Sequence, residues 1–190
     1  MPMHDLPALW LPILATAVLV FVASSLVHMV FKWHNSDYRK LANEDDVAAA
    51  LRAGSHSPGQ YVLPHCTDMK QMQDDSMKQK YEQGPVGIIT LLKPGMPNMG
   101  KHLIQWFVLC LLLSTAFAAI AVQTFGLAAN PHEAGHLIGL VSFLAFFSGS
   151  VMSAIWMGKP WAIVAKDLLD SLIYSTVCAL TFMWLWPSVA

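Results

Sequence analysis

The segment His132-Glu133-Ala134-Gly135-His136 has the residue types and the spacing of a zinc-binding helix. Two histidines four residues apart share one helix face and could bind a metal ion, and the glutamate beside the first could serve as a general base. The segment also fits an ordinary helix start, with Asn130 as N-cap, Pro131 at the first position and Glu133 favoured by the helix dipole. Both interpretations remain open from the sequence.

A zinc enzyme needs a third protein ligand, and the sequence after His136 offers none nearby. No His or Glu follows it. The only later acids, Asp167 and Asp170, lie near the start of the last apolar run and are expected on the other side of the membrane from His136. His4 is the remaining histidine expected on the same side of the membrane. The sequence therefore leaves an outer metal site of His4, His132 and His136, for zinc or copper, as one alternative, and assigns no catalytic residue.

A second group of polar residues is expected where the apolar runs meet the cytoplasm. Its members are His28, His34, Asp37, His102, Asp167, Asp170 and Tyr174. Ionisable groups at membrane depth normally face the interior of a helical bundle and find partners there. In the simpler interpretation, Asp167 and Asp170 pair with the loop, Lys166 or His28. In the alternative, His28, His102 and Asp170 converge to form a proton, metal, haem or quinone site.

Four apolar runs must position these residues. The chain has 190 residues, of which 55% are hydrophobic and only 12% are charged, against about 25% charged residues in an ordinary soluble domain. Each run is long enough to cross about 30 Å of hydrocarbon, where only a helix satisfies its own backbone. We expect an all-α membrane protein with four transmembrane helices, at residues 10–31, 102–125, 137–157 and 163–186.

The basic residues predict the orientation of these spans. Of the eleven Lys and Arg residues, nine lie in the loop 32–101, and Lys159 and Lys166 lie at the turn between the third and fourth spans. Because basic residues near span ends favour the cytoplasmic side, we expect this loop inside and both termini outside. The segment before the first span has no Lys or Arg, so we expect a retained span rather than a cleaved signal peptide.

The loop 32–101 is too apolar in places for a plain linker. A helix is expected from Glu44 to Arg52, and short strands at residues 60–63 and 86–92. We predict a small α+β loop domain between two other parts, residues 1–31 (outer N-terminus and first helix) and 102–190 (helices two to four). The formal net charge of −1 argues against a nucleic-acid partner.

Small residues recur at every fourth position in the third and fourth spans, a pattern that permits close helix approach. They are Ala145, Gly149, Ser153, Ser171, Ser175 and Ala179. Together with the short turn at residues 158–160, they predict a tight hairpin of these two spans. This role is structural rather than catalytic.

The stretches 28–41, 170–174 and 181–187 resemble a family of small, uncharacterised bacterial four-span inner-membrane proteins, for which no activity is known. The resemblance covers most of the chain and implies a bacterial inner-membrane location. It also implies that His28, His34, Asp37 and Asp170 are residues worth testing. The segment 132–136 is not part of that pattern.

The sequence contains no nucleotide-binding motif, Gly-rich phosphate loop or nucleophile–base pair. With a folded loop and spans that carry packing faces, it favours a non-enzymatic accessory or stabilising subunit of a larger membrane complex. The expected partners are the lipid bilayer and other membrane protein subunits. A metal-binding protein or zinc-dependent membrane enzyme using residues 132–136 is the first alternative. A proton, haem or quinone site near the cytoplasmic face is the second.

Overall fold

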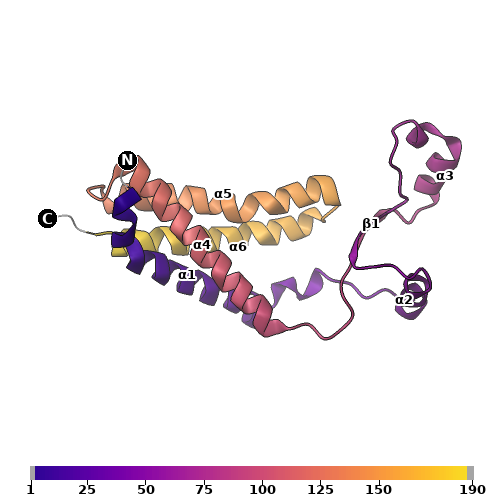
Figure 1. Cartoon of the computed structure of the whole chain (residues 1–190), viewed down its shortest axis with the longest axis horizontal. Helices are drawn as coiled ribbons and strands as arrows, with labels where there is room; N and C mark the ends of the chain where they lie inside the picture. Colours follow the sequence, from indigo (N-terminus) through magenta and orange to yellow (C-terminus); the bar gives the residue numbers. More distant parts are fainter. Residues whose placement is uncertain (1–2, 188–190) are drawn as a thin grey trace. The chain divides into compact units, whose positions relative to one another are not determined.

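The computed structural model describes the backbone of residues 3–187 and the side chains of residues 5–187. Four long apolar helices dominate it (Figure 1): α1 (Trp10–Ser25), α4 (Met99–Phe125), α5 (Pro131–Met157) and α6 (Trp161–Leu185). With its flanking turns, α1 belongs to an apolar helical stretch from Asp5 to Phe31, and all four are long and apolar enough to cross a membrane. The predicted mostly helical chain with four apolar helices is thereby confirmed.

The chain divides into two compact units. The helical unit contains the chain up to Tyr38, Asn98–Ile155 and the chain from Lys159 onward, and the loop unit contains Arg39–Pro97 with Trp156–Gly158. In the helical unit, a short 3-10 helix, η1 (Met3–Leu9), precedes α1.

The core of the helical unit lies where α1 packs against α4 and α6. Ala17 of α1 and Ala118 and Ala121 of α4 are completely buried there, as is Phe182 of α6. Alanine lets helix backbones approach closely, and the large ring of Phe182 fills the remaining space.

The end of the first apolar helix is irregular. After Ser25 the chain forms a π-helical turn, η2 (Leu26–Phe31), and then Lys32 adopts a left-handed conformation with φ 55°. A 3-10 turn, η3 (Trp33–Ser36), follows and is closed by a hydrogen bond from Asp37 N to His34 O of 3.0 Å. The reversal at Lys32 turns the segment 33–37 back toward α6, which η3 contacts.

Helices α5 and α6 run alongside each other (Figure 1), and two glycines of α5 lie close to residues of α6. A Cβ atom on Gly135 would lie 3.0 Å from the Ala179 carbonyl oxygen, and one on Gly139 would lie 3.1 Å from Ala179 Cβ. Of the small residues singled out above, Ser171 and Ser175 are buried and Ala179 is half-buried. Ala145 and Gly149 are exposed and Ser153 is half-buried.

The loop unit contains two short helices, α2 (Glu44–Ala53) and α3 (Asp75–Gln83), a 3-10 turn, η4 (Gln71–Gln73), and two strands. Strands β1 (Gly59–Leu63) and β2 (Gly87–Leu91) pair antiparallel, with Gly59 opposite Leu91 and Leu63 opposite Gly87. The predicted small sheet is therefore present.

Candidate metal centre of the helical unit

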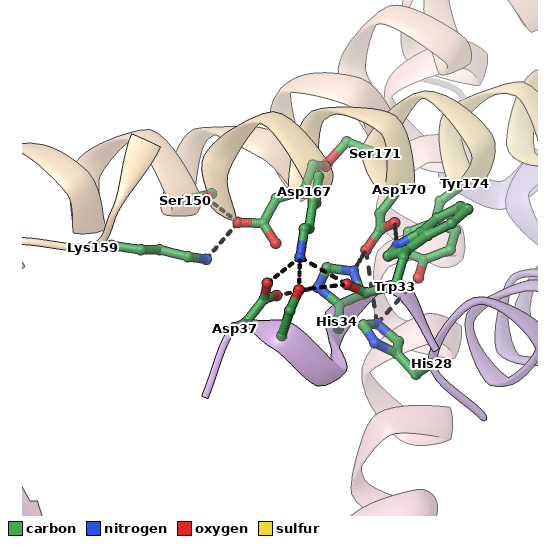
Figure 2. Close-up of polar contacts among 12 residues, drawn as sticks. His28, Trp33, His34, Asp37, Ser150, Lys159, Asp167, Asp170, Ser171 and Tyr174 are labelled. Atoms are coloured by element: carbon green, nitrogen blue, oxygen red, sulfur yellow. Dashed lines mark hydrogen bonds and ion pairs between the residues drawn. The ribbon is translucent and has the colours of Figure 1, made fainter. Parts of the chain in front are cut away.

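Asp170 is a buried carboxylate on α6, with only 5% of its surface exposed. Figure 2 shows two side chains of the segment after α1 reaching it. Trp33 Nε1 donates to Asp170 Oδ1 over 3.2 Å, and His34 Nε2 lies 2.8 Å from Asp170 Oδ2. A carboxylate removed from water is costly unless it is hydrogen-bonded and its charge is offset, and these two contacts meet part of that cost.

His34 lies between two carboxylates. Its Nε2 faces Asp170, and its Nδ1 lies 2.6 Å from Asp37 Oδ2. If both carboxylates are ionised, both ring nitrogens must donate, which requires the doubly protonated, cationic imidazole. A metal ion on Nε2 would replace one of these protons and leave the hydrogen bond from Nδ1 to Asp37 intact.

Asp37 is held in place by Lys166 of α6. The Lys166 ammonium forms an ion pair with Asp37 Oδ1 and also donates to the Trp33 carbonyl over 2.7 Å and to Ser36 Oγ over 2.8 Å. Burial alone would raise the pKa of Asp37, but the hydrogen bonds and charges of Lys166 and His34 hold that pKa below its usual value. Asp37 is therefore a fixed, ionised hydrogen-bond acceptor for His34.

His28 approaches the same centre from the π-helical turn, and 52% of its side chain is exposed. Its ring centroid lies 4.6 Å from that of His34. The Nε2 atom is 3.8 Å from Asp170 Oδ2 and 3.5 Å from Tyr174 Oη (Figure 2), so neither contact is a short hydrogen bond. The His28 ring lies near these groups, but neither of them makes a short hydrogen bond to its Nε2 atom.

The three groups fit the dimensions of a metal site. One ligand atom each of His28, His34 and Asp170 lies within 4.8 Å of the others. Tetrahedral zinc with bonds of about 2.0–2.1 Å separates its ligand atoms by roughly 3.3 Å, and the two distances to Asp170 Oδ2, 2.8 and 3.8 Å, bracket that value. Among the side chains of residues 5–187, no other trio of His, Cys, Asp or Glu meets this criterion.

Asp37 supplies the outer partner that metal-bound histidines normally have. A ligating imidazole usually donates its other N–H to a carboxylate or carbonyl, which fixes the tautomer and orients the ring. Here Asp37 accepts from His34 Nδ1 and is itself fixed by Lys166. The His34 ring is therefore preoriented whether a proton or a metal ion occupies its Nε2.

Asp167 belongs to a neighbouring but separate pair. It accepts hydrogen bonds from Ser150 of α5 and from Lys159, and the latter contact is an ion pair (Figure 2). A pocket of about 400 Å³ lies between this pair and the centre and is lined by both histidines, Asp37, Lys159 and Asp167. It gives solvent and small ligands access to His28 and His34.

The charge balance of this region favours a cation. The carboxylates of Asp37, Asp167 and Asp170 face the ammonium groups of only Lys159 and Lys166. One negative charge is left over before the histidines are counted, and either a protonated histidine or a bound metal ion balances it.

The remaining histidine predicted at this face is placed differently. His102, in the first turn of α4, is exposed and shares a pocket with His28 and Tyr174. The structure thus brings His28, His34, Asp37, Asp170 and Tyr174 together, with Asp167 close by. His102 lines a pocket together with His28, and its side chain has no polar partner within the described chain.

The segment 132–136 forms the first turns of α5. His132, Glu133 and His136 are exposed, and no third His, Cys, Asp or Glu with a described side chain completes a metal trio with them. The side chain of His4, the third predicted ligand, lies outside the described residues. Asn130 caps the helix, since its Oδ1 accepts from His132 N over 2.9 Å, so the geometry of a plain helix start is present.

Trp33 and Lys159 take part in the region without having been singled out from the sequence. A tryptophan just beyond a span is normally interpreted as an interfacial anchor, and a lysine in a short turn as a solvated charge. The sequence feature that could have identified Trp33 is its position next to His34, because neighbouring side chains in a tight turn share one environment.

The turns η2 and η3, the adjoining Asp37 and helix α6 thus form a histidine–carboxylate centre whose chemistry must be argued from its geometry. No protein-family model matches this sequence, and neither a curated protein nor a solved structure shows significant similarity to it.

Proposed function

We propose that this chain is a four-span membrane protein in which His28, His34 and Asp170 bind a divalent first-row transition metal ion. One observation carries the metal assignment. His34 and Asp170 are 136 positions apart in sequence, yet their ligand atoms meet at 2.8 Å, beside the nitrogen of a second histidine. The bound ion would join the segment 28–37 to α6, a structural and non-enzymatic role.

The membrane placement rests on the four long apolar helices and on the distribution of charge. Since the basic residues lie in the loop 32–101 and near the α5–α6 turn, that side is cytoplasmic and both termini lie outside. The metal centre, formed by the segment after α1 and the first turns of α6, then lies at the cytoplasmic face. The family resemblance supports a bacterial inner membrane.

The ligand set favours an ion of intermediate hardness. Imidazole suits zinc, copper, iron and nickel, whereas a carboxylate adds affinity for harder ions. Two histidines and one carboxylate leave at least one coordination position for water or a ligand, as in zinc and iron sites that stay open. The pocket lined by His28, His34 and Asp37 would give water or a ligand a route to that position.

The test is metal content and zinc affinity of the purified full-length protein. We expect wild type to retain one equivalent of transition metal, and His34→Ala to lose it. The matched control is His136→Ala, which removes an exposed histidine of α5. Equal metal content in wild type and His34→Ala, or loss in His136→Ala alone, would contradict the assignment.

A role as an accessory or stabilising subunit of a larger membrane complex is a second candidate, favoured by one surface of α5. Ala145 and Gly149 are exposed, and a Cβ on Gly149 would meet nothing within 4 Å. Such a small-residue face can accept another helix. Purification in mild detergent should then yield a co-purifying membrane subunit that Gly149→Leu displaces, whereas a stable, partner-free monomer would contradict this role.

A further inference from the structure

A second pocket, of about 480 Å³, lies between the end of the first apolar helix and the beginning of α4. Its volume falls within the range of sites for small organic ligands. Apart from Ser24 and Ser25, its polar lining consists of His28, His102 and Tyr174, and its apolar walls are Met29, Met99, Leu103 and Trp106.

The polar groups of this pocket are available to a ligand. The His102 side chain has no hydrogen-bond or ion-pair partner among the described residues, and Tyr174 Oη has only the 3.5 Å contact to His28 Nε2. Tyr174 is itself 95% buried, so an unfilled donor there would be costly. Each of these groups can offer an N–H or O–H to an acceptor.

The indole N–H of Trp106, by contrast, already has a partner, and its ring forms part of the pocket wall. Its Nε1 donates to Ser24 Oγ over 2.7 Å, and Ser24 Oγ in turn donates to the Phe21 carbonyl over 2.9 Å. These bonds fix the indole as a flat apolar surface. With thioethers from Met29 and Met99, the walls suit an aromatic or similarly flat ring.

We propose that this pocket binds the ring of a lipid-soluble quinone. A quinone ring is flat, and it carries two carbonyl oxygens that accept hydrogen bonds from donors such as Tyr174 Oη and a ring N–H of His102. Its apolar tail would leave along Met29 and Leu103. In the membrane placement proposed above, both flanking helices reach the cytoplasmic interface here, where the polar ring of such a molecule lies while its tail remains in hydrocarbon.

This inference goes beyond the metal centre, because Tyr174 and His102 are not metal ligands in it. His28 is the one metal ligand that also lines the quinone pocket. Quinone binding and metal binding can therefore be lost separately.

The test is titration of the full-length protein in detergent with a short-chain isoprenyl benzoquinone, by calorimetry, with zinc content measured on the same samples. We expect saturable binding that His102→Leu and Tyr174→Phe each weaken about 3- to 10-fold. His132→Leu is the matched control, since it removes an exposed histidine from the first turn of another helix and should leave affinity unchanged.

Absence of saturable binding, or equal affinity in wild type and both pocket variants, would overturn the quinone proposal, and retained zinc in those samples would leave the metal centre standing. Quinone binding by a wild-type protein that contains no zinc would support the quinone proposal and overturn the metal centre. A Soret band in the purified protein that disappears in His102→Leu would also overturn the proposal, because the pocket would then hold haem.

Discussion

Two histidine-bearing regions of this molecule differ in how their residues are brought together. The segment 132–136 carries its candidate ligands within a single helical turn, and they are exposed, without a third described ligand. The centre at Asp170 draws its residues from positions 28–37 and 166–174, and it buries its carboxylates and satisfies them. Local spacing produced a motif in the first case, whereas the fold produced a set of mutual contacts in the second.

The difference shows what a short motif leaves undetermined. Spacing of i and i+4 places two histidines on one helix face, but it does not supply the third ligand or the outer hydrogen bonds that orient them. At the Asp170 centre the turn at Lys32 brings His34 and Asp37 to α6 together, so that the same turn supplies a candidate ligand, His34, and the hydrogen-bond partner that orients it, Asp37.

Removing one acidic side chain from each region should give the largest difference in the free energy of unfolding. We expect Asp170→Ala to lower the free energy of unfolding by about 3 kcal/mol, since it leaves the Trp33 N–H and one face of His34 without their buried partner. Glu133→Ala, at an exposed site, should change it by less than about 0.5 kcal/mol. Denaturant titration of both variants measures the difference, and similar losses would contradict the contrast.

The two halves of α5 differ in how closely their glycines are packed: Gly135 has close neighbours on α6, whereas Gly149 has none. Gly135→Ala would press a methyl group against Met183 and the Ala179 carbonyl oxygen and should cost about 1–3 kcal/mol. Gly149→Ala meets no neighbour and should be neutral, or stabilising by up to about 1 kcal/mol through helix propensity. Thermal unfolding in detergent compares them, and a neutral Gly135→Ala would show that α5 and α6 pack less closely there.

Trp33 tests a single hydrogen bond of the centre. Trp33→Phe removes the indole N–H donated to Asp170 while keeping an aromatic ring, and we expect a loss of about 1.5 kcal/mol. Trp184→Phe is the matched control, because Trp184 is 79% exposed. An equal effect of the two substitutions on thermal stability would mean that the indole hydrogen bond contributes nothing.

The pH dependence of Asp37 should give the smallest effect. Its pKa is lower in the folded protein than its ordinary value of 3.8, so its contribution to stability is complete above that value and is lost as pH falls through the folded pKa. The difference in unfolding midpoint between wild type and Asp37→Asn should therefore shrink as the pH falls below 3.8. A difference that stays unchanged on acidification from about pH 4 to about pH 2 would contradict the depressed pKa.

The apolar helices could be predicted from the sequence because hydropathy and length constrain them directly. Their ends were less accurate: α5 begins at Pro131 rather than residue 137, since its polar first turns are helical although they are not apolar. The residues of the Asp170 centre could be proposed as polar groups at one face, and His34 and Asp37 were among them. Their mutual arrangement could not, because it depends on a left-handed Lys32, a conformation that non-glycine residues rarely adopt.

The central claim is that His28, His34 and Asp170 together bind one metal ion, and X-ray absorption at the zinc edge of the zinc-loaded protein tests it most directly. We predict a first shell of two imidazole nitrogens and one or two oxygens at about 2.0–2.2 Å, with the imidazole outer-shell scattering halved in His28→Ala. A shell of oxygens alone, or a wild-type spectrum that is unchanged in His28→Ala and altered in His132→Ala, would contradict the account.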